Sequence, residues 1–393
     1  MRSPAKSGPI WILVDRPESA NDNAWHLFQF LRKNRGEIDA YFVMSPTANS
    51  FEPRRKAHGE RIVPFQSVEW AELMGKRTVL ISSQRVPQIY AHPGDKQKTN
   101  LDTPSSIFVY LSHGVARGDN TESLARNPVD LLLTATEREH RQSLDRGFGR
   151  NRENTVLTGL ARWDRLLETR DKRNVDRGSI IVAPTWRSQF AAIYSSESME
   201  TVIDLEILKN SAWLSHWREA VSRLNHRLSS DGQGERLKFL VHQQLRPIVH
   251  YWHEIGMPDV GFLFYEDDKF QERLGGASLL LTDYSSVAFD AGLCQVPVIY
   301  FHFESELDVS NGHTTPGWFS YANDGFGPVA KTADEVLSLH AELTTQRYHS
   351  ASKYRDRASA ILTLGDGLAS SRTIEAVENF IAGARPPTAS RPS

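Results

Sequence analysis

The sequence predicts an α/β protein made of two doubly wound parallel sheets that face a cleft. Short apolar runs bounded by polar turns alternate along the chain with stretches of helical apolar spacing, a pattern typical of parallel strands joined by crossover helices. The alternation falls into two sets, separated by the charge-dense stretch 168–177, which is interpreted as a solvated linker. A length of 393 residues accommodates two such domains.

The first set of elements defines an N-terminal domain over residues 1–170. Apolar residues repeat at helical spacing over 25–32, and Asp22 or Asn23 is the expected cap of that helix. Each expected strand is a short apolar run, as in strands buried on both faces. The expected strands are 10–14, 38–43, 78–82, 107–111, 131–135 and 155–158.

The second set defines a C-terminal domain over residues 178–345. Helical patterns follow at 346–383, and the tail 384–393 is too polar and proline-rich to pack. The expected strands are 179–183, 238–241, 277–282 and 296–301, and the expected helices are 204–228, 332–345 and 348–380.

Composition excludes several classes of protein. A formal net charge of −2 argues against a binder of nucleic acid or other polyanions by bulk attraction. The single cysteine, Cys294, excludes an internal disulfide and a multi-cysteine zinc site, and its apolar surroundings predict a core residue. No secretory leader and no apolar run of the ~18 residues that span a bilayer is found, so a cytoplasmic protein is expected.

Ligands of open parallel sheets bind beyond the carboxyl ends of the strands, so residues that follow strands are the candidates for function. The strongest of these segments is LLLTDYSSVAFD, at 279–290. Ser285 and Ser286 stand at a helix start, where capping is the simplest role, but free N–H groups and the helix dipole also favour an anion. We therefore expect a phosphate site that includes Asp283, with Asp290 orienting a hydroxyl of the ligand.

Two further segments belong to the expected C-terminal domain. In IIVAPTWR, a strand ends before Thr185, Trp186 and Arg187, and Thr185 and Arg187 are expected to bind substrate. An arginine there can fork onto phosphate oxygens, while the tryptophan is expected to pack. In FLVHQQLRP, His242 stands at another strand end.

The N-terminal domain contributes FVYLSHGVARGD. His113 follows a buried strand almost directly, and Gly114 allows a tight turn and is expected to contact the substrate. A histidine at a strand end has the intrinsic pKa that proton abstraction requires, although a lone histidine is more often structural. The sequence lacks a P-loop, a dinucleotide fingerprint, H-E-x-x-H and G-x-S-x-G, and no metal site is predicted.

These segments together resemble a known family. TDYSSVAFD followed by PVIYFHFE resembles the signature of the CDP-glycerol:poly(glycerophosphate) glycerophosphotransferases, the primases and polymerases of teichoic acid. DNAWHLFQFL, SHGVARGD, TGLARWDRLL, APTWR and GFGPVAKTADEV resemble further family segments and occur in the family's order, over 10–336.

The resemblance implies a GT-B-like fold and assigns roles. His113 would be the general base, and Arg187, His242, Ser285 and Ser286 would hold the phosphates of the donor. Asp290 would contact the glycerol or position the site. No zinc or similar cofactor is implied.

The sequence also departs from the family pattern. The family commonly has Trp-His-Gly-Thr-Pro-Leu-Lys where this chain has Ser112 to Gly118, and Ala161-Arg162 replaces Pro-Arg. His242 lacks the usual following proline, which leaves His250 as a rival for the second histidine of the site.

The predicted function is transfer of a polyol phosphate, with glycerol favoured, from a CDP-linked donor to a lipid-linked or capsular glycan, with release of CMP. Such acceptors also predict contact with the inner membrane. The alternatives are a GT-B glycosyltransferase that uses a nucleotide sugar, and a non-catalytic nucleotide-binding module.

Overall fold

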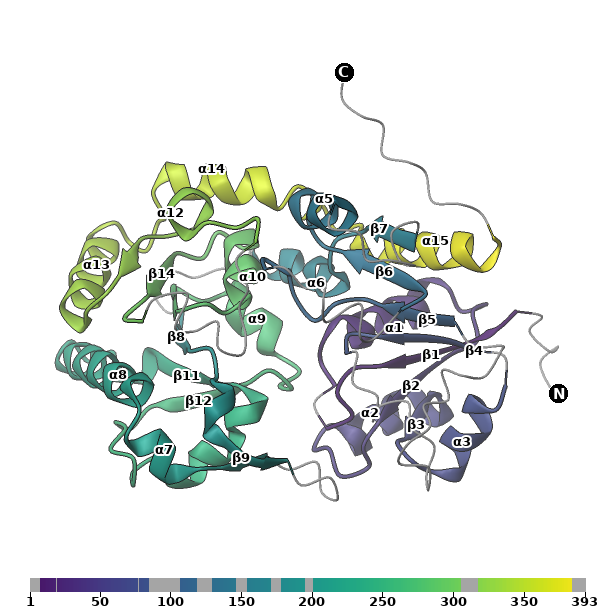
Figure 1. Ribbon diagram of the computed structural model, residues 1–393, viewed down its shortest axis with the longest axis horizontal. Coiled ribbons are helices and arrows are strands. Elements are labelled where there is room, and N and C mark those ends of the chain that lie inside the picture. Colours follow the sequence, from purple (N-terminus) through teal and green to yellow (C-terminus); the bar gives the residue numbers. More distant parts are fainter. Residues whose placement is uncertain are drawn as a thin grey trace. The chain divides into compact units, whose positions relative to one another are not determined.

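The structure is a computed structural model, and its chain divides into two compact units (Figure 1). The residues that it describes are 8–18, 20–76, 78–84, 107–118, 129–145, 154–170, 178–194, 201–304 and 317–383. Unit 1 comprises Met1–Ala116, Asn120–Arg165 and Thr363–Ser393, and unit 2 comprises Arg117–Asp119 and Leu166–Leu362. The domain bounds expected from the sequence stay a prediction.

Unit 1 is built on a seven-stranded sheet in the order β3-β2-β1-β4-β5-β6-β7, with every pairing parallel. Its strands are β1 Ile10–Val14, β2 Ala40–Met44, β3 Ile62–Pro64, β4 Thr78–Ser82, β5 Ile107–Tyr110, β6 Leu131–Thr134 and β7 Thr155–Leu157. The chain enters the sheet at the interior strand β1, extends through β2 to the edge strand β3, and continues from β4 on the other side of β1 to the edge strand β7. The order therefore reverses between β1 and β4, which is where a parallel sheet opens a ligand crevice at its carboxyl edge.

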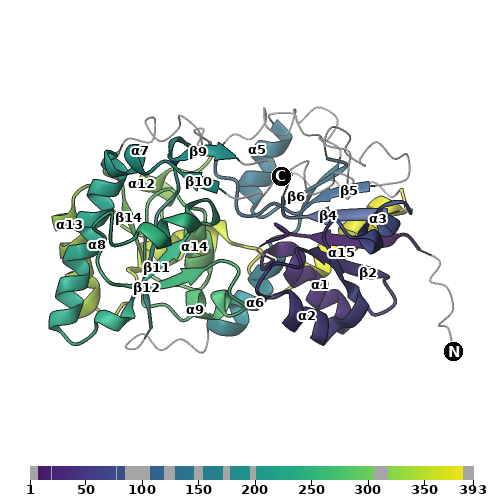
Figure 2. The ribbon, with the colours of Figure 1, turned by 90° about the horizontal axis from the view of Figure 1, so that it is seen from below.

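Strand β1 shows how this sheet is buried on both faces. Trp11 and Leu13 pack in one apolar cluster with helices α1 and α15, while Ile12 and Val14 pack in another with α3. This alternation follows from the two-residue period of a strand. The helices of this unit are α1 Asn23–Asn34, α2 Phe51–His58, α3 Val68–Met74, α5 Glu137–Asp145 and α15 Ala369–Ile381, and α6 Ala161–Arg170 begins here. Helix α15 comes from the far end of the sequence and lies beside α1 (Figure 2).

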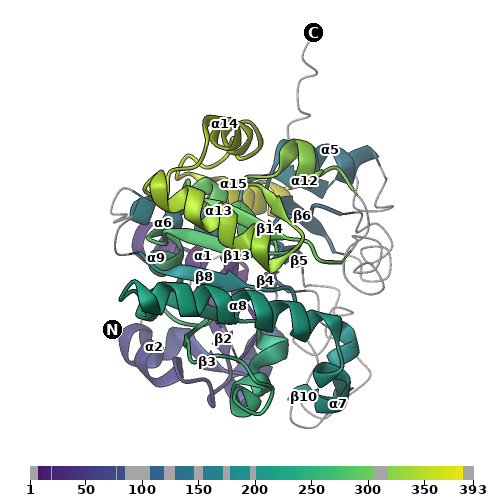
Figure 3. The same cartoon turned by 90° about the vertical axis from the view of Figure 1, so that its left-hand side faces the viewer.

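Unit 2 is built on a six-stranded parallel sheet in the order β12-β11-β8-β13-β14-β15. Its strands are β8 Ile180–Ala183, β11 Leu237–Val241, β12 Gly261–Phe264, β13 Leu279–Thr282, β14 Val298–Phe301 and β15 Val329–Ala330, with a separate antiparallel hairpin of β9 Ala191–Tyr194 and β10 Thr201–Ile203. The strand order reverses between β8 and β13. One face of this sheet is covered by α8 Ala212–Ser230 and α13 Ala333–Thr345, which lie side by side (Figure 3).

The predicted fold class, a doubly wound parallel α/β protein, describes both sheets. Each expected strand is present, with ends shifted by two residues or fewer. Strands β3, β12 and β15 and the hairpin were missed. The buried Cys294, whose Sγ lies 3.7 Å from the carbonyl oxygen of Leu166, is the core residue that was expected.

Two expectations about helices were wrong. The helix expected at 204–228 is interrupted, because the Ser211 hydroxyl accepts a hydrogen bond from the N–H of Leu214 and starts α8 anew after α7 Leu205–Lys209. The stretch 348–380 forms α14 Ser352–Ile361 and α15, separated by a turn in which Gly367 has φ of 80°.

The expected linker 168–177 begins inside α6, which continues to Arg170. Its remainder, 171–177, and the tail 384–393 lie outside the described residues. Among the helices that the structure describes, none combines the length and apolar character required to cross a bilayer.

Candidate functional site

The carboxyl edge of each sheet carries a carboxylate at the point where the strand order reverses. In unit 1, Asp15 follows β1 and accepts a hydrogen bond from the hydroxyl of Ser83, which follows β4, at 2.6 Å. In unit 2, Asp283 follows β13 and accepts one from the hydroxyl of Thr185, which follows β8, also at 2.6 Å. In each sheet, a hydrogen bond from a hydroxyl to a carboxylate thus joins the loops that follow the two strands at the reversal of strand order.

Asp283 in unit 2 is fully buried and fixes the loop after β8. Its Oδ1 accepts both the Thr185 hydroxyl and the Thr185 backbone N–H, the latter at 2.7 Å. Its Oδ2 accepts from Nη2 of Arg187 at 3.1 Å. Thr185 and Asp283, both expected to bind substrate, therefore bind each other.

The guanidinium of Arg187 is held by the protein itself. Nη2 also lies 3.0 Å from Oε2 of Glu304, and Nη1 donates to the carbonyl oxygen of Thr185 at 2.8 Å. The side chain is only 8% exposed, whereas that of Glu304 is 23% exposed. The buried Nε of Arg187 has no hydrogen-bond partner among the residues that the structure describes. The fork expected to bind phosphate is thus occupied by two carboxylates, of which Glu304 is the more accessible.

The two serines stand at the start of helix α10, Val287–Leu293. Ser286 is its N-cap residue but its side chain makes no capping bond, while the hydroxyl of Ser285 accepts from the N–H of Val287 at 3.4 Å. Both serines are partly exposed. Asp290, in the same helix, is only 3% exposed, so its predicted contact with a ligand hydroxyl stays a prediction.

His242 packs against aromatic side chains at the end of β11. Its ring stacks on Trp186 at 5.8 Å between centroids and meets Tyr265 edge-on at 6.2 Å. Nδ1 accepts a hydrogen bond from the N–H of Gln244 at 3.1 Å, so in the neutral ring the proton is on Nε2. His242 therefore offers a donor rather than a base. The rival His250 is exposed in the last turn of the 3-10 helix η7, Gln243–Tyr251.

A cluster of aromatic residues beside the serines was missed from the sequence. His302 stacks on Tyr284 at 4.2 Å, and its Nε2 donates to the carbonyl oxygen of Asp283 at 3.1 Å. The guanidinium of Arg117 lies 5.5 Å from the ring centroid of Tyr284 and 5.2 Å from that of Tyr321. This arrangement places a cation over aromatic faces next to the segment expected to bind phosphate.

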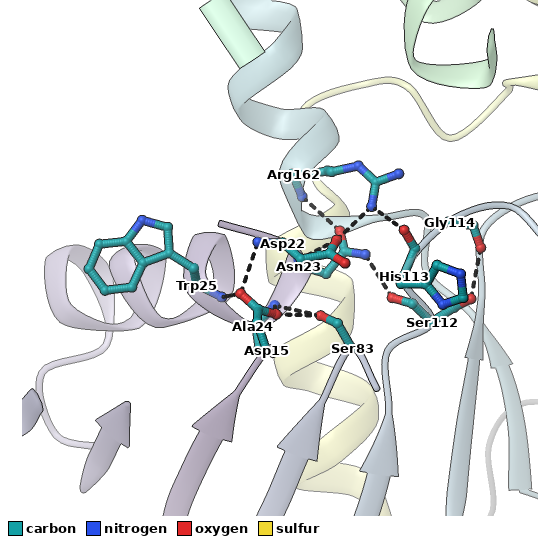
Figure 4. Close-up of polar contacts among 10 residues, drawn as sticks. All are labelled: Asp15, Asp22, Asn23, Ala24, Trp25, Ser83, Ser112, His113, Gly114 and Arg162. Atoms are coloured by element: carbon teal, nitrogen blue, oxygen red, sulfur yellow. Dashed lines mark hydrogen bonds and ion pairs between the residues drawn. The ribbon is translucent and has the colours of Figure 1, made fainter. Parts of the chain in front are cut away.

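In unit 1, the buried carboxylate of Asp15 organises the start of helix α1 (Figure 4). Oδ2 accepts from the N–H groups of Asp22 and Trp25 at 2.9 and 3.1 Å, and Oδ1 accepts from that of Ala24 at 3.1 Å. These are N–H groups that a helix start leaves without intrahelical partners. Burial raises the pKa of Asp15, and its hydrogen bonds oppose the rise.

The loop that carries His113 is held through its main chain. Ser112, at φ of 60°, donates its hydroxyl to the carbonyl oxygen of Gly114 at 2.7 Å. Its own carbonyl oxygen accepts from the side-chain amide of Asn23 at 2.8 Å, and that of His113 accepts from Nη1 of Arg162 at 2.8 Å. Gly114 is buried, whereas His113 is exposed. The predicted base is thus an accessible imidazole on a firmly held loop.

Glu139 holds the other end of the same loop. Its Oε1 accepts from the N–H of Ala116 at 2.9 Å, and its Oε2 accepts from that of Ala135 at 2.8 Å. The hydroxyl of Thr136 in turn accepts from the N–H of Glu139 at 3.2 Å, so the two residues form a capping box at the start of α5. Burial raises the pKa of Glu139 to about 7, while its backbone hydrogen bonds act in the opposite direction.

Replacing Glu139 by glutamine is expected to flatten the pH dependence of stability. The folded protein keeps the proton of Glu139 up to a pKa of about 7, whereas the unfolded chain loses it near 4.5, so the free energy of unfolding falls as the pH rises between these values. The loss amounts to about 3 kcal/mol at most. Urea unfolding of the wild type and of Glu139→Gln from pH 5 to pH 8 measures this loss. If the free energy of unfolding changed with pH equally in the two proteins, the expectation would be contradicted.

Comparison with curated proteins finds relatives in teichoic acid synthesis. The chain is 23% identical over 362 residues to the minor teichoic acid biosynthesis protein GgaB of Bacillus subtilis, covering 91% of this chain and 38% of that protein. It is 22% identical over 377 residues to the teichoic acid poly(glycerol phosphate) polymerase of the same species, covering 88% and 45%. The chain therefore spans less than half the length of these two relatives.

Comparison with solved structures finds the same fold. The wall teichoic acid polymerase TagF matches with a TM-score of 0.57 at 16% identity, over 95% of this chain and 89% of that one. A UDP-N-acetylglucosamine 2-epimerase structure from Listeria monocytogenes, described as putative, matches with a TM-score of 0.58 at 13% identity, over 98% and 100%. The predicted GT-B-like fold is confirmed by these matches.

The family resemblance seen in the sequence is confirmed by a match of nearly the whole chain to a family model. That model is described as CDP-Glycerol:Poly(glycerophosphate) glycerophosphotransferase and matches residues 1–379. It covers both units, including the Arg162 and Asp283 segments. The chain belongs to the CDP-glycerol:poly(glycerophosphate) glycerophosphotransferase family.

Proposed function

We propose that this chain transfers glycerol phosphate from CDP-glycerol to a hydroxyl of a glycan acceptor and releases CMP. The observation that carries the proposal is the family match over residues 1–379. The polar residues at the carboxyl edges of the two sheets are consistent with it, because they offer an accessible imidazole in unit 1 and hydrogen-bond donors in unit 2.

The donor is assigned to unit 2. Nε2–H of His242 and the hydroxyls of Ser285 and Ser286 would donate to phosphate oxygens. The positive charge of the largely buried Arg187 would attract the phosphates of the donor. Glu304, which pairs with Arg187, is the anion that a phosphate would replace. Asp290 and Gly114 keep their assignment as substrate-binding residues of this proposal.

The base is assigned to His113. Its imidazole would take the proton of the acceptor hydroxyl while the acceptor oxygen attacks the β-phosphorus of the donor. The bond between that phosphorus and the oxygen bridging to the α-phosphate breaks, and CMP leaves with the electron pair. Phosphoryl transfer of this kind depends mainly on positioning and on stabilisation of charge.

The acceptor is proposed to be a lipid-linked or capsular glycan, reached from the cytoplasmic face of the inner membrane. The relatives' roles in teichoic acid synthesis support this assignment. Sedimentation with vesicles of anionic lipid, with and without a glycan lipid, measures the membrane contact, and absence of binding to either would contradict it.

Incubation of the purified chain with CDP-glycerol and a glycan acceptor is expected to release CMP. CDP-ribitol and sugar nucleotides serve as parallel donors, and the nucleotide product is identified by chromatography. Release of a nucleoside diphosphate from a sugar nucleotide would instead indicate a glycosyltransferase. Absence of turnover with the whole donor set, under conditions where the protein is folded, would overturn the proposal.

A further inference from the structure

The loop that carries His113 depends on side chains from two distant helix starts. Arg162 comes from the first turn of α6, and Asn23 from the start of α1. The N–H of Arg162 donates to the side-chain oxygen of Asn23 at 3.2 Å, so the two residues also bind each other. Each then binds one carbonyl oxygen of the loop, that of His113 or that of Ser112.

The guanidinium of Arg162 is itself fixed by a carboxylate. Nη1 lies 2.7 Å from Oδ1 of Asp22, and the same nitrogen donates to the carbonyl oxygen of His113. The side chain of Arg162 is 8% exposed and that of Asp22 is 23% exposed. Asp22 is tied in turn to Asp15 through its backbone N–H (Figure 4). A continuous set of contacts therefore runs from the end of β1 to the main chain of His113.

We propose that Arg162 is the positioning residue of the proposed general base: its guanidinium bridges the main-chain carbonyl of His113 and the Asp22 carboxylate, so that the imidazole keeps a fixed place. The inference rests on the proposed function, in which His113 takes the acceptor proton. Arg162 acts through the loop, because its guanidinium binds the main-chain carbonyl oxygen of His113 and the carboxylate of Asp22.

The physical reason lies in the sensitivity of proton transfer to distance. A general base must come within hydrogen-bond reach of its proton, and a shift of about 1 Å costs roughly a hundredfold in rate. Ser112 at positive φ puts the loop in a conformation that few non-glycine residues adopt. Carbonyl oxygens held from outside the loop keep it in that conformation.

The test compares Arg162→Met with Arg162→Lys in the CMP-release assay. The methionine removes the contacts of Nη1 with Asp22 and with the carbonyl oxygen of His113. This change is expected to lower kcat by roughly 10- to 100-fold, while the KM for the donor changes by less than about twofold. Lysine keeps the positive charge on a side chain one bond shorter. The kcat of Arg162→Lys is therefore expected to lie between those of the wild type and Arg162→Met. Added methylguanidine is expected to restore part of the kcat of the methionine variant.

Arg372→Met is the matched control. Arg372 belongs to the same unit and also binds a carbonyl oxygen, that of Thr158 at 2.9 Å, and a carboxylate, that of Asp366 at 2.7 Å, but it holds another segment. Its kcat is expected to stay near that of the wild type at a temperature where both variants are folded.

Two outcomes would overturn the inference. One is an Arg162→Met enzyme with wild-type kcat. The other is a loss of kcat that Arg372→Met shares to the same extent, without rescue by methylguanidine, since that result would indicate general destabilisation. A wild-type protein inactive with all donors would instead contradict the proposed function, and the position of the loop would then be followed by NMR of the His113 ring in both variants.

Discussion

Replacing His113 by alanine is expected to lower kcat by roughly 10²- to 10⁴-fold, the range that a positioned general base contributes. Its imidazole is exposed and its neighbours hold the loop by main-chain atoms, so removal of the ring leaves those contacts in place. Binding of CDP-glycerol, assigned to unit 2, is expected to be unchanged. CMP release gives the first quantity and calorimetric titration with the donor gives the second.

His253→Ala provides the control for this experiment. His253 is another exposed histidine, with 79% of its side chain accessible, and it has no role in the proposed site. Its activity should equal that of the wild type. An undiminished kcat of His113→Ala would contradict the assignment of His113 as the general base. A loss of affinity for CDP-glycerol instead would indicate that His113 binds the donor.

The same assay separates His242 from its rival. His242 is packed between Trp186 and Tyr265 and presents Nε2–H, so His242→Ala is expected to raise the donor KM by removing that donor. His250 is exposed, and its replacement is expected to have little effect. The opposite ranking of the two variants would assign the second histidine of the site to His250.

The sequence predicted the strands well because the central strands of a parallel sheet are buried on both faces. Strands β1 and β4 are continuous apolar runs, and their ends were predicted without error. Strands β3 and β15 have three and two residues, too few to show a periodic pattern. The break at Ser211 was missed because one capping hydroxyl changes the helix without interrupting the apolar pattern.

The candidate site was predicted only in part. Strand ends identified Thr185, Asp283 and His113, because position after a strand can be read along the chain. Their partners could not be read in this way. Glu304 lies 117 residues from Arg187 along the chain, and Arg162 lies 49 residues from His113, so only the folded chain brings them together. The TGLARWDRLL segment contained Arg162 but gave no indication of its partner.

Replacing Arg187 by alanine is expected to lower the free energy of unfolding by about 3–5 kcal/mol, the usual cost of breaking a buried ion pair on one side. Asp283 is fully buried and would lose the guanidinium that donates to its Oδ2, and the carbonyl oxygen of Thr185 would lose one of its two donors, keeping only Nε1 of Trp213. Urea unfolding measures the change. Arg223→Ala, which removes a partly exposed arginine that pairs with Glu219 at 3.2 Å and with Asp334, is the control and should unfold close to the wild type.

A paired substitution distinguishes a lost attraction from a stranded charge. If the cost comes from the uncompensated carboxylate, Arg187→Met with Asp283→Asn should recover part of the stability lost by Arg187→Met alone. Equal instability of the single and double variants would contradict that explanation.

The donor-binding role adds a separate expectation. If a donor phosphate replaces Glu304 on Arg187, Glu304→Gln removes a competing anion and should lower the Kd for CDP-glycerol, whereas an arginine that only fixes the loop should leave that Kd unchanged.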